Sequence, residues 1–402
     1  MRDLAPIFKT LLKDKVAPLL LVLQVAVTFM VMVNAINMIN ERSKNMSRPI
    51  GVDEENSFYV LTNLQGEPDS LDVRLAEELL QLRALPGVKG VTPLSALPLE
   101  GFGRAMAINK EPGKEKAFEH GAYYATDEGV VDGLGLSLIA GENLSVNDSS
   151  TTFLDGHFVS TNVLITKALA QSLSPEDWRL AVGMTIYLFD TPQKVKGIVE
   201  TMQGPWAWWY GVELNVISPV TEAYESIRYF VRVEEGKRDE VMQDFLAHLL
   251  KTPGRIIEVS ESIKALKAKA YQEDRATSRL LLAVCVGLLV VTSLGIYGQA
   301  RFSVNRRKRQ IGTRRALGAS KGQVMRFFML ENAVVSLTGL VIGFIAALSL
   351  SEQFSQHFGL TPVPLPYLLS GMAALFVLGQ LSVSYPALQA SRVEPAIATR
   401  SA

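Results

Sequence analysis

Four windows of uncharged, mostly apolar residues dominate the hydropathy pattern of the 402-residue chain. A helix needs about 20 predominantly apolar residues to cross the roughly 30 Å hydrocarbon core of a bilayer, and each window is long enough. The pattern therefore predicts transmembrane helices at residues 16–39, 280–300, 331–351 and 367–385.

The first window has one feature of a secretory signal peptide, because four basic residues precede it. However, no small-residue cleavage site follows, and the apolar run is longer than a typical signal core. We therefore interpret this window as a retained membrane anchor. The basic residues before it are Arg2, Lys9, Lys13 and Lys15.

Lysine and arginine residues gather at one end of the predicted spans. Residues 301–326, between the second and third spans, hold nine of them and no Asp or Glu, and Arg392 and Arg400 follow the fourth span. Loops rich in Lys and Arg remain in the cytoplasm. The predicted cytoplasmic parts are residues 1–15, 301–330 and 386–402.

The basic run RRKRQIGTRR at 306–315 could also be read as a nucleic-acid-binding patch. It lies next to an apolar window of about 20 residues and lacks interleaved aromatic residues. The positive-inside rule explains it better, and we expect no nucleic-acid partner.

Residues 41–279 have the opposite charge balance, with 25 Lys and Arg against 35 Asp and Glu. We expect this segment, and a short loop at 352–366, on the other side of the membrane. Short runs rich in β-branched and aromatic residues predict strands, at 57–62, 163–166, 185–189, 214–218 and 229–233. Apolar residues at helical spacing predict helices at 71–85 and 239–250.

The predicted fold is therefore an α-helical membrane protein with four transmembrane helices and a large extracytoplasmic α/β domain of two lobes. The domain covers residues 40–259, and residues 90–220 form an insertion into the first lobe. Residues 260–279 are expected to form a stalk helix, capped by Ser260 and continuous with the second span, because no Pro or Gly interrupts it. Such a helix could act as a rod, unlike a flexible linker.

A tryptophan-rich segment, QGPWAWWY at 203–210, stands out within this domain. Its aromatic residues could be core or subunit packing, or they could form a contact surface for a substrate or partner, because Trp and Tyr are enriched at binding hot spots. Both interpretations remain open. The residues concerned are Trp206, Trp208, Trp209 and Tyr210.

The sequence has few features of an enzyme or a metal protein. Cys285 is the single cysteine and so cannot form an internal disulfide, and the four histidines lack metal-ligand spacing. G-x-S-x-G, H-E-x-x-H and the phosphate-binding G-x-x-x-x-G-K-[ST] loop are all missing from these 402 residues. We therefore expect no catalytic residue, no metal site and no cofactor in this chain, and the pattern argues against a membrane-anchored enzyme.

The cytoplasmic segment after the second span has clear helix signals. A basic helical stretch ends at Leu317, where Gly318 can adopt the left-handed conformation. Ser320 then begins a new helix, and Gln323 completes a capping box. The sequence predicts two short helices joined by a tight turn, suited to dock in a groove of a soluble partner.

This segment, RKRQIGTRRALGASKGQVMRFFMLENAVVSLTGLVIG, closely resembles the coupling region of MacB/FtsX/LolC-like permeases, the mechanotransmission class of ABC transporters. Residues 125–148 and 164–189 are similar to the MacB-type periplasmic core domain, and YPALQASRVEPAIATR resembles the family's C-terminal ending. The resemblance implies contact with the ATPase by Ile311, Gly312, Arg314, Arg315, Ala316, Gly318, Ala319 and Ser320.

The same resemblance implies the partners. MacB itself carries an N-terminal nucleotide-binding domain, whereas this sequence starts at its first span, so we expect a separate ABC ATPase in two copies that binds ATP and Mg. A second permease, identical or homologous, would complete the complex in the bacterial inner membrane, and a periplasmic adaptor and outer-membrane channel are further candidate partners. The expected work is export or extraction of a periplasmic or membrane-associated peptide, toxin, siderophore or lipoprotein.

Three points remain open. An FtsX-like protein would use the same motion to activate a periplasmic partner, such as a cell-wall hydrolase, without transport. Glu331 could be a proton-relay carboxylate, although its place beside Arg326 favours a helix-end charge. Gly339 and Gly343 form a G-x-x-x-G packing motif in the third span, a weak indication of dimerisation.

Overall fold

The computed structural model describes residues 16–64, 71–114, 116–148, 152–154, 157–188, 190–220, 226–358 and 361–393. The chain divides into two compact units. One, the helical unit, contains the chain up to Met46 and from Asp274 onward, and the other, the α/β unit, runs from Ser47 to Glu273.

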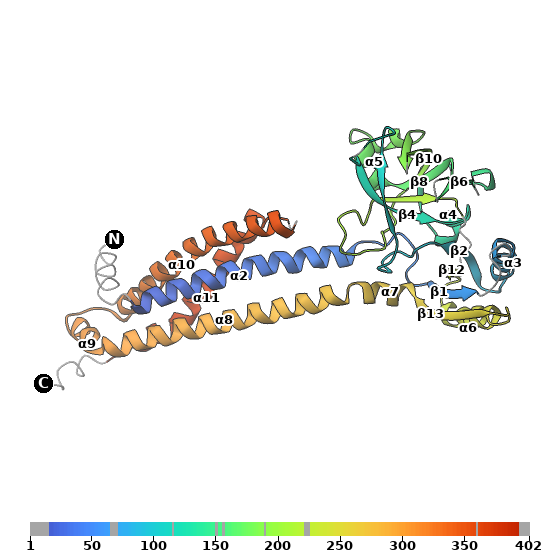
Figure 1. Cartoon of the computed structure of the whole chain (residues 1–402). Helices are drawn as coiled ribbons and strands as arrows, with labels where there is room; N and C mark the ends of the chain where they lie inside the picture. The colour runs from blue at the N-terminus through green and yellow to red at the C-terminus, as the bar shows by residue number, and fades with distance from the viewer. Residues whose placement is uncertain are drawn as a thin grey trace. The chain divides into compact units, whose positions relative to one another are not determined.

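The helical unit is built on four long helices that run alongside one another (Figure 1). Within the described residues, these four are long and apolar enough to cross a membrane, which agrees with the predicted number of spans. A fifth, shorter helix precedes the third of them. The helices are α2 (Val16–Ser47), α8 (Gln272–Arg306), α9 (Lys308–Ala316), α10 (Lys321–Phe358) and α11 (Leu365–Ser391).

The G-x-x-x-G motif of α10 packs against α2 of the same chain. A Cβ atom at Gly339 would lie 2.8 Å from the carbonyl oxygen of Val22, and one at Gly343 would lie 2.7 Å from that of Ala26. The two glycines therefore allow close approach of two helices within one chain. This packing removes the basis for reading the motif as a dimer contact.

Polar side chains add interhelical hydrogen bonds inside the unit. The Thr28 and Thr292 hydroxyls of α2 and α8 are 2.8 Å apart and buried. The Asn332 side-chain amide of α10 donates to the Gly379 carbonyl of α11 at 3.2 Å. Such bonds stabilise helix association where no water is present to satisfy polar groups.

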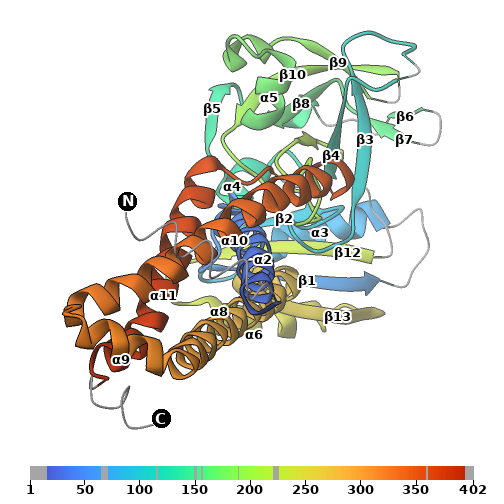
Figure 2. The ribbon, with the colours of Figure 1, turned by 90° about the vertical axis from the view of Figure 1, so that its left-hand side faces the viewer.

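The α/β unit contains two lobes, each built on one sheet, which confirms the predicted fold class. The first lobe has a four-stranded antiparallel sheet in the order β13-β1-β12-β2 (Figure 2). Helices α3 and α6 contribute leucine, valine and phenylalanine side chains to its core. Its elements are β1 (Ser57–Leu64), α3 (Leu71–Arg83), β2 (Val88–Leu94), β12 (Ser226–Val233), α6 (Arg238–Leu249) and β13 (Arg255–Ser262).

The second lobe occupies the chain between β2 and β12 and has a seven-stranded mixed sheet in the order β5-β10-β8-β11-β4-β3-β9. Leu169, Ala170 and Leu173 of α5 pack on this sheet. The sheet strands are β3 (Arg104–Asn109), β4 (Glu119–Ala125), β5 (Leu138–Gly141), β8 (Asn162–Thr166), β9 (Thr185–Leu188), β10 (Thr191–Val199) and β11 (Asn215–Ser218). The other elements of this lobe are α5 (Lys167–Leu173), short 3-10 turns at Val146–Asp148 and Trp178–Ala181, and the hairpin of β6 (Thr152–Leu154) and β7 (His157–Val159). Helix α4 (Val130–Leu134), in the same stretch of chain, packs on β2 and β12 of the first lobe.

A buried ion pair ties helix α3 of the first lobe to its sheet. Arg255 of β13 pairs with Glu78 of α3, and both side chains are more than 90% buried. Arg255 also donates to the Thr62 hydroxyl at 3.0 Å, and the Tyr229 hydroxyl donates to Glu78. Burial is the main reason that the pKa of Tyr229 lies well above its usual value.

The predicted stalk helix 260–279 is not one helix. Residues 260–262 belong to β13 and pair with β1, so Ser260 is not a helix cap. The helix α7 (Ile263–Ala270) is capped by Ser262, whose Oγ accepts from the Ala265 amide at 3.1 Å. The chain then leaves the helix at Tyr271 before α8 begins. Pairing with a distant strand overrides the local helical pattern here.

Candidate functional site

The turn between α9 and α10 has the local geometry that its sequence predicts. Gly318 has φ +97°, in the region that favours glycine. The Ser320 amide donates to Oε1 of Gln323 at 2.9 Å, and the Gln323 amide donates to the Ser320 hydroxyl at 3.2 Å. These two reciprocal bonds form a capping box that fixes the first turn of α10.

The second helix of this turn is not short, contrary to the prediction. It is the start of α10, which continues without a break for 38 residues through the third predicted span. Residues 321–358 contain no proline, and good helix formers fill most positions around Gly322. A displacement of the turn would therefore act directly on the third span.

The residues predicted to couple to an ATPase divide into two groups. Ile311 and Gly312 are buried, and Ile311 packs in a small core with Val304, Val324 and Phe328. This core attaches α9 to its neighbouring helices. The exposed members are Arg314, Ala316, Gly318 and Ser320, whereas Arg315 and Ala319 are half-buried.

A basic cavity of about 390 Å³ lies between α9 and the start of α10. The Arg314 guanidinium lies 5.1 Å from the ring centroid of Phe327, a cation–π arrangement that orients the arginine. The lining contains three arginines and no acidic residue, and because Arg307 is paired with Glu331 outside the lining, Arg314 and Arg326 supply the positive potential of the cavity. Its lining residues are Arg307, Gln310, Ile311, Arg314, Ala319, Gln323, Val324, Arg326, Phe327 and Phe328.

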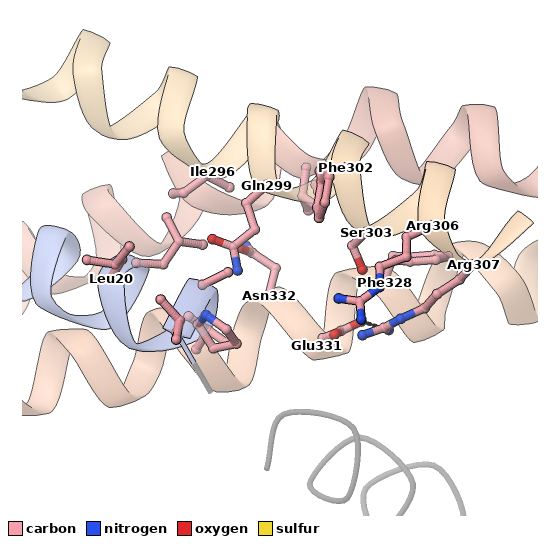
Figure 3. A pocket seen from close by; sticks show the side chains of 17 residues that line it. Leu20, Ile296, Gln299, Phe302, Ser303, Arg306, Arg307, Phe328, Glu331 and Asn332 are labelled. Carbon is pink, nitrogen blue, oxygen red and sulfur yellow. Dashed lines mark hydrogen bonds and ion pairs between the residues drawn. The ribbon is translucent and has the colours of Figure 1, made fainter. Parts of the chain in front are cut away.

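A second cavity, of about 440 Å³, lies between the ends of α2, α8, α10 and α11 (Figure 3). Arg307 and Glu331 point toward each other at its edge, and their ion-pair distance is 2.8 Å. Glu331 is ten residues into α10 and pairs with Arg307, so the interpretation as a helix-end charge beside Arg326 is wrong. The pair joins the junction between α8 and α9 to α10.

Arg307 lines both cavities, and sequence reasoning did not single it out. One basic residue among many in RRKRQIGTRR gives no local signal for a partner 24 positions away. Phe327 was missed for the same reason, because its relation to Arg314 depends on how the turn folds back.

The tryptophan-rich segment shows both packed and exposed side chains. Trp206 and Trp209 are half-buried and meet edge to face, with ring centroids 5.6 Å apart. Trp208 and Tyr210 are 82% and 73% exposed. The segment therefore combines a packed aromatic base with two outward-facing rings. Among the described residues, no group of His, Cys, Asp and Glu has the arrangement to hold a metal ion.

Two family models match the chain. The model described as the MacB-like periplasmic core domain matches residues 20–248, more than half of the chain. The model described as the FtsX-like permease C-terminal matches residues 282–395. The second match includes the turn between α9 and α10 and both cavities' α10 residues.

Curated relatives include two proteins named macrolide export ATP-binding/permease protein MacB. The one from Pasteurella multocida (strain Pm70) is 23% identical and covers 83% of this chain and 50% of its own length. The one from Chromobacterium violaceum is 26% identical and covers 77% and 49%. The chain thus spans about half the length of the curated relatives it matches.

A solved structure of the periplasmic region of MacB from Actinobacillus actinomycetemcomitans matches 56% of this chain and 97% of its own, with 15% identity and a TM-score of 0.34. The family models carry the assignment. The chain belongs to the MacB/FtsX-like family of ABC transporter permeases and is an inner-membrane protein with a periplasmic domain.

Proposed function

We propose that this permease couples ATP hydrolysis by an ABC ATPase in the cytoplasm to movement of its periplasmic domain. The observation that carries the proposal is the turn between α9 and α10. Its exposed, basic residues stand on a buried base around Ile311 and lead directly into the 38-residue α10. A partner that displaces the turn would therefore displace the third span.

The Arg307–Glu331 ion pair supports the same proposal. Both side chains are mostly buried, and the pair joins the junction between α8 and α9 to α10. Breaking a buried pair by removing one partner leaves an uncompensated charge, which costs roughly 3–5 kcal/mol. The two helices are thus held together at the level of the turn, so a push on the turn would be shared between the second and third spans.

The proposed complex contains two permeases, identical or homologous, and two ATPase subunits. The basic turn, the N-terminus and the C-terminus would lie in the cytoplasm, because nine Lys and Arg residues occupy residues 301–326. The curated relatives are named for macrolide export. For this chain we propose export or extraction of a periplasmic or membrane-associated substrate, which the match to the MacB-like domain favours over FtsX-like signalling.

Co-purification tests the coupling proposal. The tagged full chain would be isolated from its native membrane in mild detergent, and ATPase partners would be identified by mass spectrometry and by ATP turnover. We expect an ABC ATPase to co-purify with the native chain. The amount that co-purifies with the R314Q/R315Q variant should be at least tenfold lower.

The matched control is R301Q. Arg301 is an exposed arginine of α8 that lines neither cavity, so its replacement removes charge without touching the turn. An equal loss of the ATPase from R301Q would show that R314Q/R315Q acts through a general loss of positive charge. Retention of the ATPase by R314Q/R315Q, or absence of any ATPase from the native preparation, would overturn the proposal.

A further inference from the structure

The aromatic loop, residues 203–211, presents two large side chains that nothing in the described α/β unit covers. Trp208 is 82% exposed and Tyr210 is 73% exposed. Under them lies the edge-to-face pair of Trp206 and Trp209. The Trp209 and Tyr210 rings also meet, with centroids 5.3 Å apart. Exposed aromatic rings on such a packed base are a feature of binding surfaces.

A second loop holds the aromatic loop in place. The Leu99 amide donates to the Gly204 carbonyl at 3.0 Å, and the Gly101 amide donates to the Pro205 carbonyl at 2.8 Å. Leu99 is buried and has φ +65°, a conformation that non-glycine residues adopt only when their surroundings impose it. Binding through a preformed loop of this kind loses little conformational entropy.

Gln203 fixes the start of the aromatic loop to the two chain segments that lead into the membrane helices. Its side-chain amide donates to the Pro49 carbonyl at 3.0 Å, and its Oε1 accepts from the Tyr271 hydroxyl at 3.2 Å. Gln203 itself is fully buried. Pro49 lies two residues after the end of α2, and Tyr271 immediately precedes α8. The aromatic loop therefore begins where the α/β unit is joined to the first and second spans.

The connection from the α/β unit to the second span is short. Eight residues of α8 lie between Tyr271 and the first apolar residue of the span, Leu280, a rise of about 12 Å. Each interfacial region of a bilayer is about 5–8 Å thick beyond the hydrocarbon. The aromatic loop turns back on itself between Gly204 and Val212, because the Gly204 amide donates to the Val212 carbonyl at 2.5 Å and the Trp209 amide donates to the Trp206 carbonyl at 3.2 Å. Trp208 lies within this turn.

The composition of the aromatic loop favours lipid as its binding partner. The segment from Thr201 to Val212 contains no charged residue and no histidine, although residues 41–279 are otherwise rich in charge. Trp and Tyr concentrate at membrane interfaces, where the ring meets the acyl boundary and the N–H or O–H group meets water and headgroups. A protein partner recognised by charge would need groups that this loop lacks.

We propose that the aromatic loop is a membrane-interface anchor, with Trp208 and Tyr210 inserted among the lipid headgroups of the periplasmic leaflet. The inference rests on the family assignment and on the contacts of Gln203, and it is independent of the ATPase partner. Through Gln203, the anchor is hydrogen-bonded to Pro49 and Tyr271, which lie close to the junctions with α2 and α8 in the chain.

Fluorescence quenching by spin-labelled lipid tests the anchor. The full chain would be reconstituted in liposomes that contain a phospholipid with a nitroxide near its headgroup, and tryptophan emission would be compared with that in unlabelled liposomes. The variants are W208F and, as the matched control, W178F. Trp178 belongs to the second lobe and stacks with the Arg179 guanidinium at 4.5 Å.

We expect W208F to lose roughly half or more of the emission that the spin-labelled lipid quenches, because the interfacial indole has been removed. W178F should keep the quenched emission of the native chain. Both substitutions replace one aromatic ring by another at sites that are not fully buried, and near-UV circular dichroism would verify that each variant remains folded.

Two results would overturn the membrane-anchor proposal. The anchor is refuted if spin-labelled lipid quenches the native chain and W208F equally, while a water-soluble quencher reaches Trp208 in the liposomes. Protection of Trp208 that appears only when a purified periplasmic protein is added would assign the loop to a protein partner instead. Loss of ATPase co-purification would leave the lipid quenching unchanged, so the two proposals fail separately.

Discussion

Asp148 shows how a single buried carboxylate can stabilise the second lobe. Burial alone favours the neutral acid, but hydrogen bonds to the charged form outweigh it and lower the pKa to about 2. Lys196 donates to Oδ2 at 2.5 Å, the Ser145 amide and hydroxyl donate at 2.7 Å, and Asn162 donates to Oδ1 at 2.7 Å. The network connects the loop before β6 to strands β8 and β10.

The sign of this pKa shift predicts a pH dependence. Because the folded pKa lies below the usual 3.8, the stabilisation is complete above about pH 4 and is lost as the pH falls toward 2. Lys196→Met should raise the pKa of Asp148 and lower the free energy of unfolding by about 2 kcal/mol at pH 7. Denaturant unfolding of the full chain in detergent, followed between pH 7 and pH 2, would measure both.

The control for this prediction is Lys194→Met. Lys194 lies on the same strand, is exposed, and does not contact Asp148. The difference in stability between native chain and Lys196→Met should shrink as the pH falls from 4 to 2, whereas Lys194→Met should show no such trend. A difference that stays constant over this pH range would show that Asp148 does not carry the stabilisation.

At the scale of elements, the sequence predicts those features whose contacts join residues close together in the chain. Gly318, Ser320 and Gln323 predict a turn and a capping box because every bond involved spans three residues, and both features are present. The four long helices follow from hydropathy for the same reason. The two-lobed domain was predictable in outline, since its strand and helix patterns alternate along the chain.

Features that depend on distant partners were not predictable in this way. Ser260 resembles a helix cap, but it pairs with Val60 of β1, 200 residues earlier. Glu331 has Arg326 as its sequence neighbour and Arg307 as its ion-pair partner. The exposure of Trp208 and the anchoring of Gln203 likewise depend on segments that only the tertiary fold brings together.

The packing of α10 on α2 gives a prediction for a whole element. Gly343→Leu places a side chain where even a Cβ atom would meet the Ala26 carbonyl at 2.7 Å, so α10 must move away from α2. We expect the free energy of unfolding to fall by about 1–3 kcal/mol, which is typical of overpacking. Thermal denaturation in detergent, monitored by size-exclusion chromatography, would record it as a lower melting temperature.

Gly298→Leu is the matched substitution in α8. Nothing lies within 4 Å of a Cβ atom at Gly298, so the new side chain meets open space. The melting temperature of this variant should stay close to that of the native chain. Equal destabilisation by both substitutions would indicate that any leucine at a span glycine has the same effect and that the contact of α10 with α2 is not its cause.

At the scale of the whole molecule, charge and sequence order act together. In the chain, α2 leads into the acidic α/β unit, and α8 leads from that unit to the basic turn. The long segment 41–279 has a net charge of −10, from 25 basic and 35 acidic residues. The positive-inside rule applies to short segments next to the spans and not to a long domain such as 41–279. The short basic segments therefore determine the orientation of the chain in the membrane.

Cysteine labelling tests this orientation. Cys285 is the single cysteine and is buried, so C285S gives a background in which new cysteines can be labelled one at a time. Glu235→Cys places a thiol in the exposed turn between β12 and α6, and Asn305→Cys places one on the exposed surface near the end of α8. Neither change removes a basic residue.

A membrane-impermeant maleimide added to intact spheroplasts should label Glu235→Cys and leave Asn305→Cys unlabelled until the inner membrane is broken. The nine cations of residues 301–326 are the reason, since moving them across the membrane against the potential is costly. Labelling of Asn305→Cys from outside would reverse the topology. It would also remove the turn between α9 and α10 from the reach of any cytoplasmic ATPase, and the coupling proposal would fail with it.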